Sequence, residues 1–163
     1  HCIGVDPYYL AEAGKKVNFD TKIILAGRKV NDSIPDYLLK NINRKLKKRS
    51  RVLLLGLSFK EDVGDIRNSK SIELLKKIKS KKFIVDCYDP RVLAEELDRE
   101  YKIKMSPPKG KYDCIIVAVA HKEFVRMNKK KIFELINKNT YVIDVKGIWN
   151  KKISSKLKNY WSL

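Results

Sequence analysis

Two side chains near the start of the chain could carry out covalent chemistry together. Cys2 and Asp6 lie four positions apart. A cysteine thiolate can attack an aldehyde, and a nearby carboxylate can activate the water that later releases the acyl group. By themselves the residues favour simpler alternatives, in which Cys2 is an inert core thiol and Asp6 caps a helix. Capping and catalysis are compatible roles for one carboxylate.

A second group of candidates lies in the segment 56–69, which follows an apolar run. Lys60 and Arg67 occur there, just before a helix that Ser69 could cap. The free N–H groups at a helix N-terminus favour anions, so the two cations could bind phosphate. The two glycines of this segment have the spacing of neither G-x-G-x-x-G nor a P-loop. A structural loop with surface charges is an equally good interpretation.

Two further residues follow later apolar runs. His121 comes after the third run, and a lone histidine there is more often a hydrogen-bonded structural group than an acid or base. The chain has no second His, Cys or carboxylate at a ligand-like spacing, so we expect no metal site. Lys146 follows the fourth run and could contact a phosphate, with a solvated lysine as the alternative.

Short apolar runs alternate with amphipathic segments from residue 51 onward, which predicts the elements that would position these side chains. Strands are expected at Val52–Leu55, Phe83–Tyr88, Cys114–Ala118 and Tyr141–Val145, and helices at Ser69–Ser80, Arg91–Tyr101, Lys129–Asn137 and Asn150–Leu157. Such alternation predicts a parallel sheet covered by helices on both faces, an α/β, Rossmann-like doubly wound fold. Ligands of such sheets bind at the carboxyl ends of the strands.

A helical segment is expected to precede the sheet. A short helix is predicted from Asp6-Pro7 to Gly14, because proline suits the first helical turn and glycine the exit. A longer helical region should span 20–48, with a cap or a kink near 31–35. It carries one apolar stripe at steps of four, formed by Ile34, Leu38, Ile42 and Leu46.

The charge composition is lopsided. The 163 residues include 37 Lys and Arg against 19 Asp and Glu, for a formal net charge of +18. Such a balance is compatible with nucleic-acid binding. However, 29 of the 37 basic residues are lysines, which read bases and phosphates less specifically than arginine forks. Solvated lysine-rich faces are therefore the favoured interpretation.

The cysteines and the hydropathy pattern indicate in which cellular compartment the protein is expected. Cys87 and Cys114 lie in apolar runs, where buried free thiols are usual, and three cysteines in all show no paired spacing. A reducing cytoplasm fits this pattern. We expect no membrane partner, since no apolar run is long enough for a span and no signal peptide is recognisable. The chain starts at His1 without a methionine, which suggests a piece of something longer.

Several segments, in order along the chain, resemble motifs of the UDP-glucose/GDP-mannose dehydrogenase family. The similarity is closest to the branch that acts on UDP-N-acetylhexosamines, and it extends to about residue 150. The segments are HCIGVDPYYL at 1–10, RKVNDSIP at 28–35, GLSFK at 56–60 with DIRNS at 65–69, YDP at 88–90 and AVAHKEF at 118–124. Five ordered agreements are much more specific than any single motif.

The resemblance implies a three-part, cytoplasmic, homodimeric enzyme that supplies uronic acids for polysaccharide. Residues 1–48 would end its central helical dimerisation domain, and residues 49–163 would form its UDP-sugar-binding α/β domain. An NAD-binding domain would lie upstream, so this chain alone should not oxidise anything. The family oxidises the C6 hydroxyl of a UDP-sugar to a carboxylate with two NAD.

The resemblance also implies residue roles. Cys2 matches the nucleophile that forms a thiohemiacetal and then a thioester, and Asp6 matches the carboxylate that activates water. Lys60 matches a lysine that contacts the nucleotide sugar, and Arg67 an arginine that reaches NAD. Lys146 lies near where relatives carry the arginine of Asp-Gly-Arg, and a lysine cannot replace that bidentate fork.

Two other functions are compatible with the sequence. One is a basic α/β nucleic-acid-binding module without enzymatic activity, which would bind DNA or RNA in a steeply salt-dependent way. Arginines interleaved with aromatic residues along one strand would favour it, and no such pattern is present. The other is a stand-alone structural or dimerisation domain.

Overall fold

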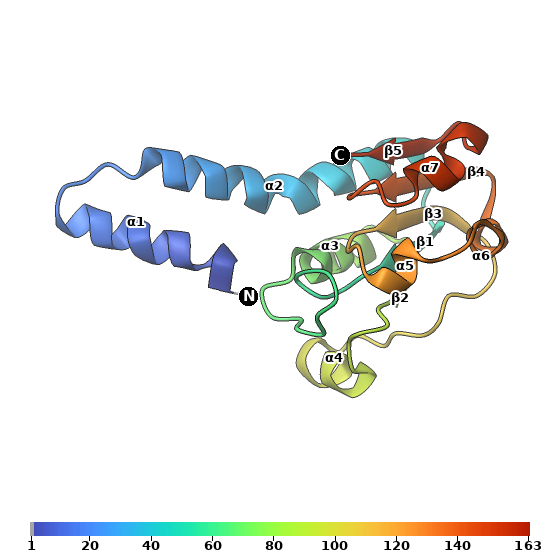
Figure 1. Ribbon diagram of the computed structural model, residues 1–163, viewed down its shortest axis with the longest axis horizontal. Coiled ribbons are helices and arrows are strands. Elements are labelled where there is room, and N and C mark those ends of the chain that lie inside the picture. The colour runs from blue at the N-terminus through green and yellow to red at the C-terminus, as the bar shows by residue number, and fades with distance from the viewer. Residues whose placement is uncertain (1) are drawn as a thin grey trace.

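The computed structural model describes residues 2–163, and it begins with a hairpin of two helices (Figure 1). A 3-10 turn, η1 (Cys2–Gly4), leads into α1 (Asp6–Lys16), which has proline in its first turn. The helix predicted from Asp6 is thus confirmed, although it continues two residues past Gly14. The first residue of the family motif, His1, lies outside the described residues.

The second helix of the hairpin, α2 (Lys22–Lys45), is continuous. Of the two alternatives expected near residues 31–35, a cap or a kink, the cap is wrong, because the helix runs through this segment with Pro35 buried inside it. The apolar stripe explains why the helix continues. Leu38 and Ile42 are fully buried in the core of the α/β part, and this packing outweighs the hydrogen bond that proline removes.

The α/β part contains a sheet of five parallel strands in the order β2-β1-β3-β4-β5 within residues 2–163. The strands are β1 (Arg51–Leu55), β2 (Ile84–Tyr88), β3 (Tyr112–Val117), β4 (Ile136–Asp144) and β5 (Tyr160–Ser162). The predicted doubly wound α/β fold is therefore confirmed. The short edge strand β5 was not predicted, because its three residues include no apolar run.

The connections are α3 (Lys70–Lys79), α4 (Ala94–Tyr101), α5 (Lys122–Val125), α6 (Lys129–Leu135), α7 (Asn150–Ile153) and the 3-10 turn η2 (Ser154–Lys156). The helix predicted to reach Asn137 ends at Leu135, because Ile136 already pairs with Tyr112 in the sheet. The single helix predicted at 150–157 is instead α7 followed by η2. Among the described residues, we find no helix long and apolar enough to cross a bilayer.

Alternate residues of the strands fill two separate cores. Val52 and Leu54 of β1 point to a cluster shared with α2 and α3, whereas Leu53 and Leu55 point to one shared with α5, α6 and α7. This is the period-two alternation of a strand that is buried on both faces. The hairpin helix α2 thus covers one face of the sheet, and the helices of the C-terminal half cover the other.

Gly56 ends β1 in a conformation that other residues rarely adopt. Its φ is +90°, and an added Cβ would lie 2.5 Å from the Cβ of Val119. We expect Gly56→Ala to lower the free energy of unfolding by about 1–3 kcal/mol, because backbone strain and overpacking coincide. Urea denaturation would measure this. The matched control is Gly27→Ala in α2, because no atom lies within 4 Å of the added Cβ there. This variant should raise the free energy of unfolding by about 0.5–1 kcal/mol. Equal losses of stability in both variants would contradict the argument.

Candidate functional site

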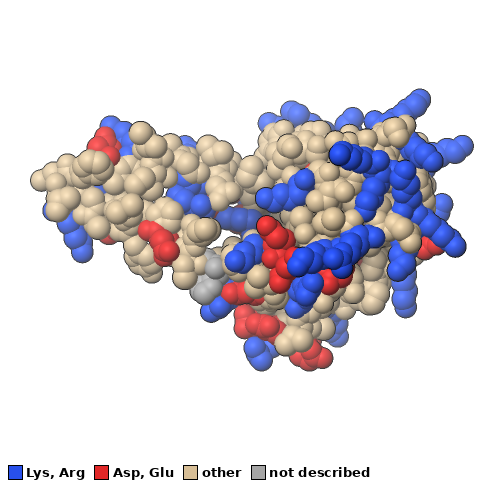
Figure 2. Space-filling view, in the orientation of Figure 1, with Lys and Arg blue, Asp and Glu red and all other residues tan. Residues whose placement is uncertain are grey.

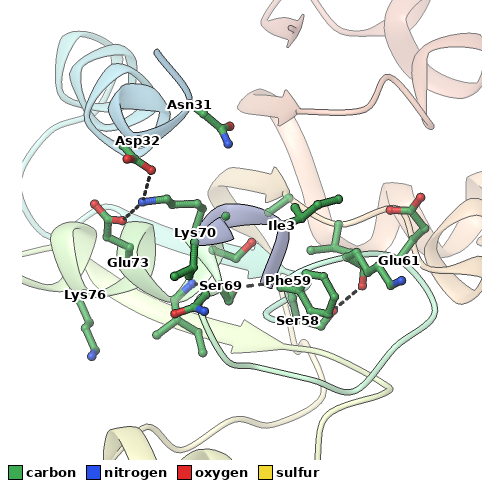
Figure 3. A pocket seen from close by; sticks show the side chains of 18 of the residues that line it. Ile3, Asn31, Asp32, Ser58, Phe59, Glu61, Ser69, Lys70, Glu73 and Lys76 are labelled. Atoms are coloured by element: carbon green, nitrogen blue, oxygen red, sulfur yellow. Dashed lines mark hydrogen bonds and ion pairs between the residues drawn. The ribbon is translucent and has the colours of Figure 1, made fainter. Parts of the chain in front are cut away.

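A cleft of about 730 Å³ lies between the helical hairpin and the carboxyl edge of the sheet. The loop after β1 contributes Ser58, Phe59 and Lys60, and Lys146 follows β4. The opposite wall comes from α1 and α2, including Asp32 (Figure 3). The cleft therefore lies at the strand ends where the topology predicts ligand binding.

Two of the predicted site residues share this cleft. Lys60 and Lys146 are far apart in sequence, both are exposed, and both line the cleft. The ammonium of Lys60 lies 5.4 Å from the ring centroid of Phe59. Two lysines in one cleft create a positive potential that suits an anionic ligand such as a diphosphate.

Arg67 lies in the same loop but is held by a neighbour. Its Nε and Nη2 donate to the two carboxylate oxygens of Asp65, at 2.9 and 2.6 Å. These hydrogen bonds lower the pKa of Asp65 to about 2. They are also the main cause of the raised pKa of Arg67, to which the nearby Cys2 and Glu100 side chains contribute less. The structure thus brings Cys2 and Arg67 into electrostatic range.

Cys2 and Asp6 flank the short segment that leads into α1, at the open end of the hairpin that faces the cleft. The residues between them, Ile3 to Val5, line the cleft, and both Cys2 and Asp6 are exposed. Exposure does not fit the alternative of an inert core thiol. Asp6 is the first residue of α1, and Val5 occupies the N-cap position, so the capping alternative does not hold either.

His121 is part of a buried polar network beneath the loop. It is fully buried, and its Nδ1 accepts the backbone N–H of Asp62 at 2.9 Å. That nitrogen therefore carries no proton, and the Nε2–H donates to Asp89 Oδ2 at 3.0 Å, with Ser58 Oγ 3.1 Å away. The interpretation of His121 as structural agrees with this geometry.

Asp89 is the centre of that network. Besides His121, its carboxylate accepts the backbone N–H groups of Leu57, Ser58 and Arg91 at 2.6, 3.0 and 2.8 Å. Burial raises the pKa of Asp89, but these hydrogen bonds outweigh burial and the net pKa is lowered. The Asp-Pro pair after β2 thus anchors the loop that carries Lys60, although it does not line the cleft.

The remaining two cysteines are core residues, as predicted. Cys87 and Cys114 are buried in β2 and β3. Burial raises the pKa of the Cys87 thiol to about 11 and raises that of Cys114 still further. Among the described residues, no group of three or more His, Cys, Asp or Glu side chains could hold a metal ion.

Sequence reasoning missed the residues of α2 that close the cleft. Asp32 accepts hydrogen bonds from Tyr8 Oη at 2.5 Å and from Arg28 Nη2 at 3.1 Å. It also pairs with Lys70 Nζ at 2.9 Å, and Lys70 pairs with Glu73 (Figure 3). This cluster joins α1, α2 and the start of α3. The sequence signals were the family-like segment 28–35 and the i, i+4 spacing of Arg28 and Asp32, and neither reveals the partner on α3.

Comparison with known proteins adds sequence evidence. Residues 53–151 match the UDP binding domain of the UDP-glucose/GDP-mannose dehydrogenase family. A UDP-N-acetyl-D-glucosamine 6-dehydrogenase of Pseudomonas aeruginosa is 40% identical over 90% of the chain, and a UDP-N-acetyl-D-mannosamine dehydrogenase of Methanococcus vannielii is 32% identical over 96%. The chain covers 36% of each of these relatives, or about a third of their length.

Structural comparison supports the fold. A UDP-glucose dehydrogenase from Pyrobaculum islandicum superposes with a TM-score of 0.78 at 19% identity. The superposition covers 98% of this chain and 36% of that one. The hairpin and the α/β part together therefore have a counterpart in a larger protein of known structure.

Proposed function

The chain belongs to the UDP-glucose/GDP-mannose dehydrogenase family, and from this membership we propose that it forms the UDP-sugar-binding part of an NAD-dependent nucleotide-sugar 6-dehydrogenase. The whole enzyme would oxidise the C6 hydroxyl of a UDP-hexose or UDP-N-acetylhexosamine to the uronic acid, for polysaccharide biosynthesis. The chain alone, which spans about a third of its relatives, is expected to bind the nucleotide without turnover.

The observation that carries this proposal is the cleft at the carboxyl edge of the sheet. One wall of the cleft lies in the region that matches the UDP binding domain, and that wall contains the exposed cations Lys60, Lys76 and Lys146. A UDP-sugar offers a diphosphate to these cations and hydroxyls to polar lining residues such as Asn31. The volume of about 730 Å³ is of the size expected for a ligand of this class.

Cys2 and Asp6 are proposed to perform the covalent chemistry. The Cys2 thiolate would add to the C6 aldehyde and form a thiohemiacetal, which becomes a thioester in the second oxidation. Asp6 would help a water molecule to attack that thioester, so that the acid leaves and the thiol is restored. The exposure of both side chains at the rim of the cleft is compatible with substrate access.

NAD would supply the hydride acceptor for both oxidations. The described residues could supply one contact to NAD, but they do not form a full NAD-binding site. The loop after β1 is closed by the backbone hydrogen bond from Phe59 N to Asp65 O, and it lacks the glycine spacing of a dinucleotide cradle. Arg67 is 60% exposed and oriented by Asp65, so it could add one cationic contact. Most NAD contacts would come from an upstream domain.

A homodimer is proposed to form through the hairpin. The side chains of Val17, Phe19 and Ile23 are 75%, 67% and 89% exposed around the turn between α1 and α2. Clustered apolar side chains of this size are typical of protein interfaces.

Cytoplasmic localisation is part of the same proposal, because the free buried thiols suit a reducing compartment.

Isothermal titration calorimetry of the chain tests the nucleotide site. We expect UDP and UDP-N-acetylglucosamine to bind and NAD alone to give no measurable heat. Lys60→Ala should weaken UDP binding by roughly tenfold, because one charge-assisted contact to a phosphate is lost. The control is Lys130→Ala, an exposed lysine on α6 that does not line the cleft. An absence of heat with either uridine ligand at millimolar concentration would count against the proposal.

A further inference from the structure

The edge of the sheet opposite the cleft carries a row of cations. Four segments lead into β1, β2, β3 and β5 at this edge, which we call the amino edge, and the first residues of β4 form the fifth segment: 45–50, 79–83, 107–111, 154–159 and 136–140. Together they contain eleven lysines and Arg49, and they contain no aspartate or glutamate. All twelve cations are exposed. Figure 2 shows Lys and Arg side chains gathered over the end of the α/β part that lies farthest from the hairpin.

Hydrogen bonds show that the five segments are neighbours in one row. Arg49 N donates to Lys82 O at 2.9 Å, and Arg51 donates to the carbonyls of Lys109 and Lys111 at 3.3 Å. Thr140 Oγ1 donates to Tyr112 O at 2.7 Å, and Asn159 donates to Asn139 O. Five strands at a spacing of about 4.8 Å give a row of about 19 Å.

The charges of the amino edge are not neutralised within the chain. Within residues 2–163, none of the ion pairs joins these twelve cations to a carboxylate. Two acids next to the row, Asp86 and Asp113, are engaged by Arg51, which is not one of the twelve. Its Nη2 pairs with Asp86 at 2.8 Å, and its backbone N–H donates to Asp113 at 2.8 Å.

Helix stabilisation accounts for only some of these lysines. Lys45 and Lys79 lie in the last turns of α2 and α3, where cations interact favourably with the helix dipole. Lys48, Lys81, Lys111 and Lys158 lie beyond the helix ends. They lie outside the last helical turn, within which the interaction with the helix dipole is concentrated, and like charges side by side repel one another. An external anionic partner would relieve that repulsion.

We propose that the amino edge binds the surface of an anionic lipid bilayer, with phosphate headgroups as the ligand. A row of exposed lysines along one edge can meet the negative charges of a bilayer surface without any apolar insertion, as juxtamembrane polybasic segments do. Nucleic acids fit less well. The twelve cations include one arginine, and the large exposed hydrophobic residues include no aromatic side chain in these segments on which bases could stack.

This inference goes beyond the proposed function and departs from the sequence expectation of no membrane partner, which rested on the lack of an apolar span. Docking through the amino edge would leave the cleft free, because the cleft lies at the opposite ends of the strands. Binding of UDP and binding of the bilayer should therefore be independent, and saturating UDP should not change vesicle affinity.

Co-sedimentation of the chain with vesicles tests the proposal. We expect binding to vesicles that contain phosphatidylglycerol and none to vesicles of phosphatidylcholine alone. Binding should disappear when salt rises from about 0.1 M to about 1 M, as the Debye length falls from about 10 Å to about 3 Å. The triple variant Lys48→Glu, Lys81→Glu and Lys111→Glu should bind at least about tenfold more weakly.

The control variant carries the same charge change on the hairpin, at Lys16→Glu, Lys29→Glu and Lys40→Glu, all of which are exposed. It should retain most of the vesicle affinity, and circular dichroism should show both triple variants folded. No binding to phosphatidylglycerol vesicles, or equal losses in the two variants, would overturn the proposal. So would tighter binding of duplex DNA to the same edge at equal phosphate concentration, which would make it a nucleic-acid surface instead.

Discussion

Replacing Cys2 with alanine is expected to abolish formation of the uronic acid by the full-length enzyme, with a loss of at least about 10³-fold in kcat. The reason is chemical: alanine offers no nucleophile to hold the C6 carbon between the two oxidations. The structure places Cys2 in the η1 turn, exposed beside the rim of the cleft and within electrostatic range of Arg67. Steady-state kinetics with quantification of the acid would measure the effect.

The controls for Cys2 separate chemistry from binding. Calorimetric affinity for UDP should be unchanged in Cys2→Ala, because Cys2 is not among the described residues that line the cleft. Cys87→Ala provides the cysteine control, since that thiol is buried in β2 and faces the core. The Cys87→Ala variant should be less stable but should still form the acid, because Cys2 is retained. A wild-type yield of acid from Cys2→Ala would refute the assignment of the nucleophile.

Replacing Asp89 with asparagine is expected to lower the free energy of unfolding by about 2–4 kcal/mol at neutral pH. The carboxylate is 1% exposed and accepts hydrogen bonds from His121 and from three backbone N–H groups. An asparagine would turn an NH₂ group toward some of these donors and leave them unpaired. Urea denaturation would measure the loss, and Asp20→Asn, at an exposed acid before α2, should change stability by no more than about 0.5 kcal/mol.

The pH dependence of that loss has a definite sign. The folded pKa of Asp89 is lowered, so its contribution to stability is present above the unfolded pKa of about 3.9 and is lost as pH falls through the folded value. The stability difference between wild type and Asp89→Asn should therefore be largest near neutral pH and should shrink below about pH 4. A difference that stayed constant down to pH 2 would show that the carboxylate charge is not involved.

The same variant should weaken UDP binding, although Asp89 does not line the cleft. Asp89 holds the backbone of Leu57 and Ser58, and Ser58 Oγ in turn donates to the carbonyl of Lys60 at 2.9 Å. Loosening this network would let the loop that carries Lys60 move. Calorimetry under conditions where the variant is fully folded would measure the change, and an unaltered affinity would show that the loop is positioned by other contacts.

Much of the fold was predictable because the signals are local. The apolar runs in β1, β3 and β4 are buried on both faces, and each shows as a short stretch of consecutive hydrophobic residues. The run in β2 lies at the sheet edge and is only partly buried, but its apolar residues still predicted a strand. The errors also have local causes. Ile136 and Asn137 continue a helical pattern in the sequence, yet they belong to β4, because Ile136 pairs with β3. Strand β5 is only three residues long, and its structure depends on pairing with β4.

The candidate site was predictable only in its parts. Lys60 and Lys146 follow strands, so their meeting at one edge of the sheet could be expected from parallel topology. The wall formed by Tyr8, Arg28 and Asp32 could not, because it depends on how the hairpin packs against α3. The division of the chain at residues 48 and 49 stays a prediction, although α2 shares its core with the sheet.

The sequence by itself determined most of the elements, the all-parallel sheet and the chemistry of single residues, because these depend on periodicity, on connection length and on side-chain type. Only the tertiary structure decided which charges meet. It buried His121 against Asp89, paired Asp32 with Lys70, and gathered the lysines of five separate segments into one unneutralised edge. The physical reason is that electrostatic interactions depend on distance in space, and only the packed fold brings groups from distant parts of the sequence within a few ångströms.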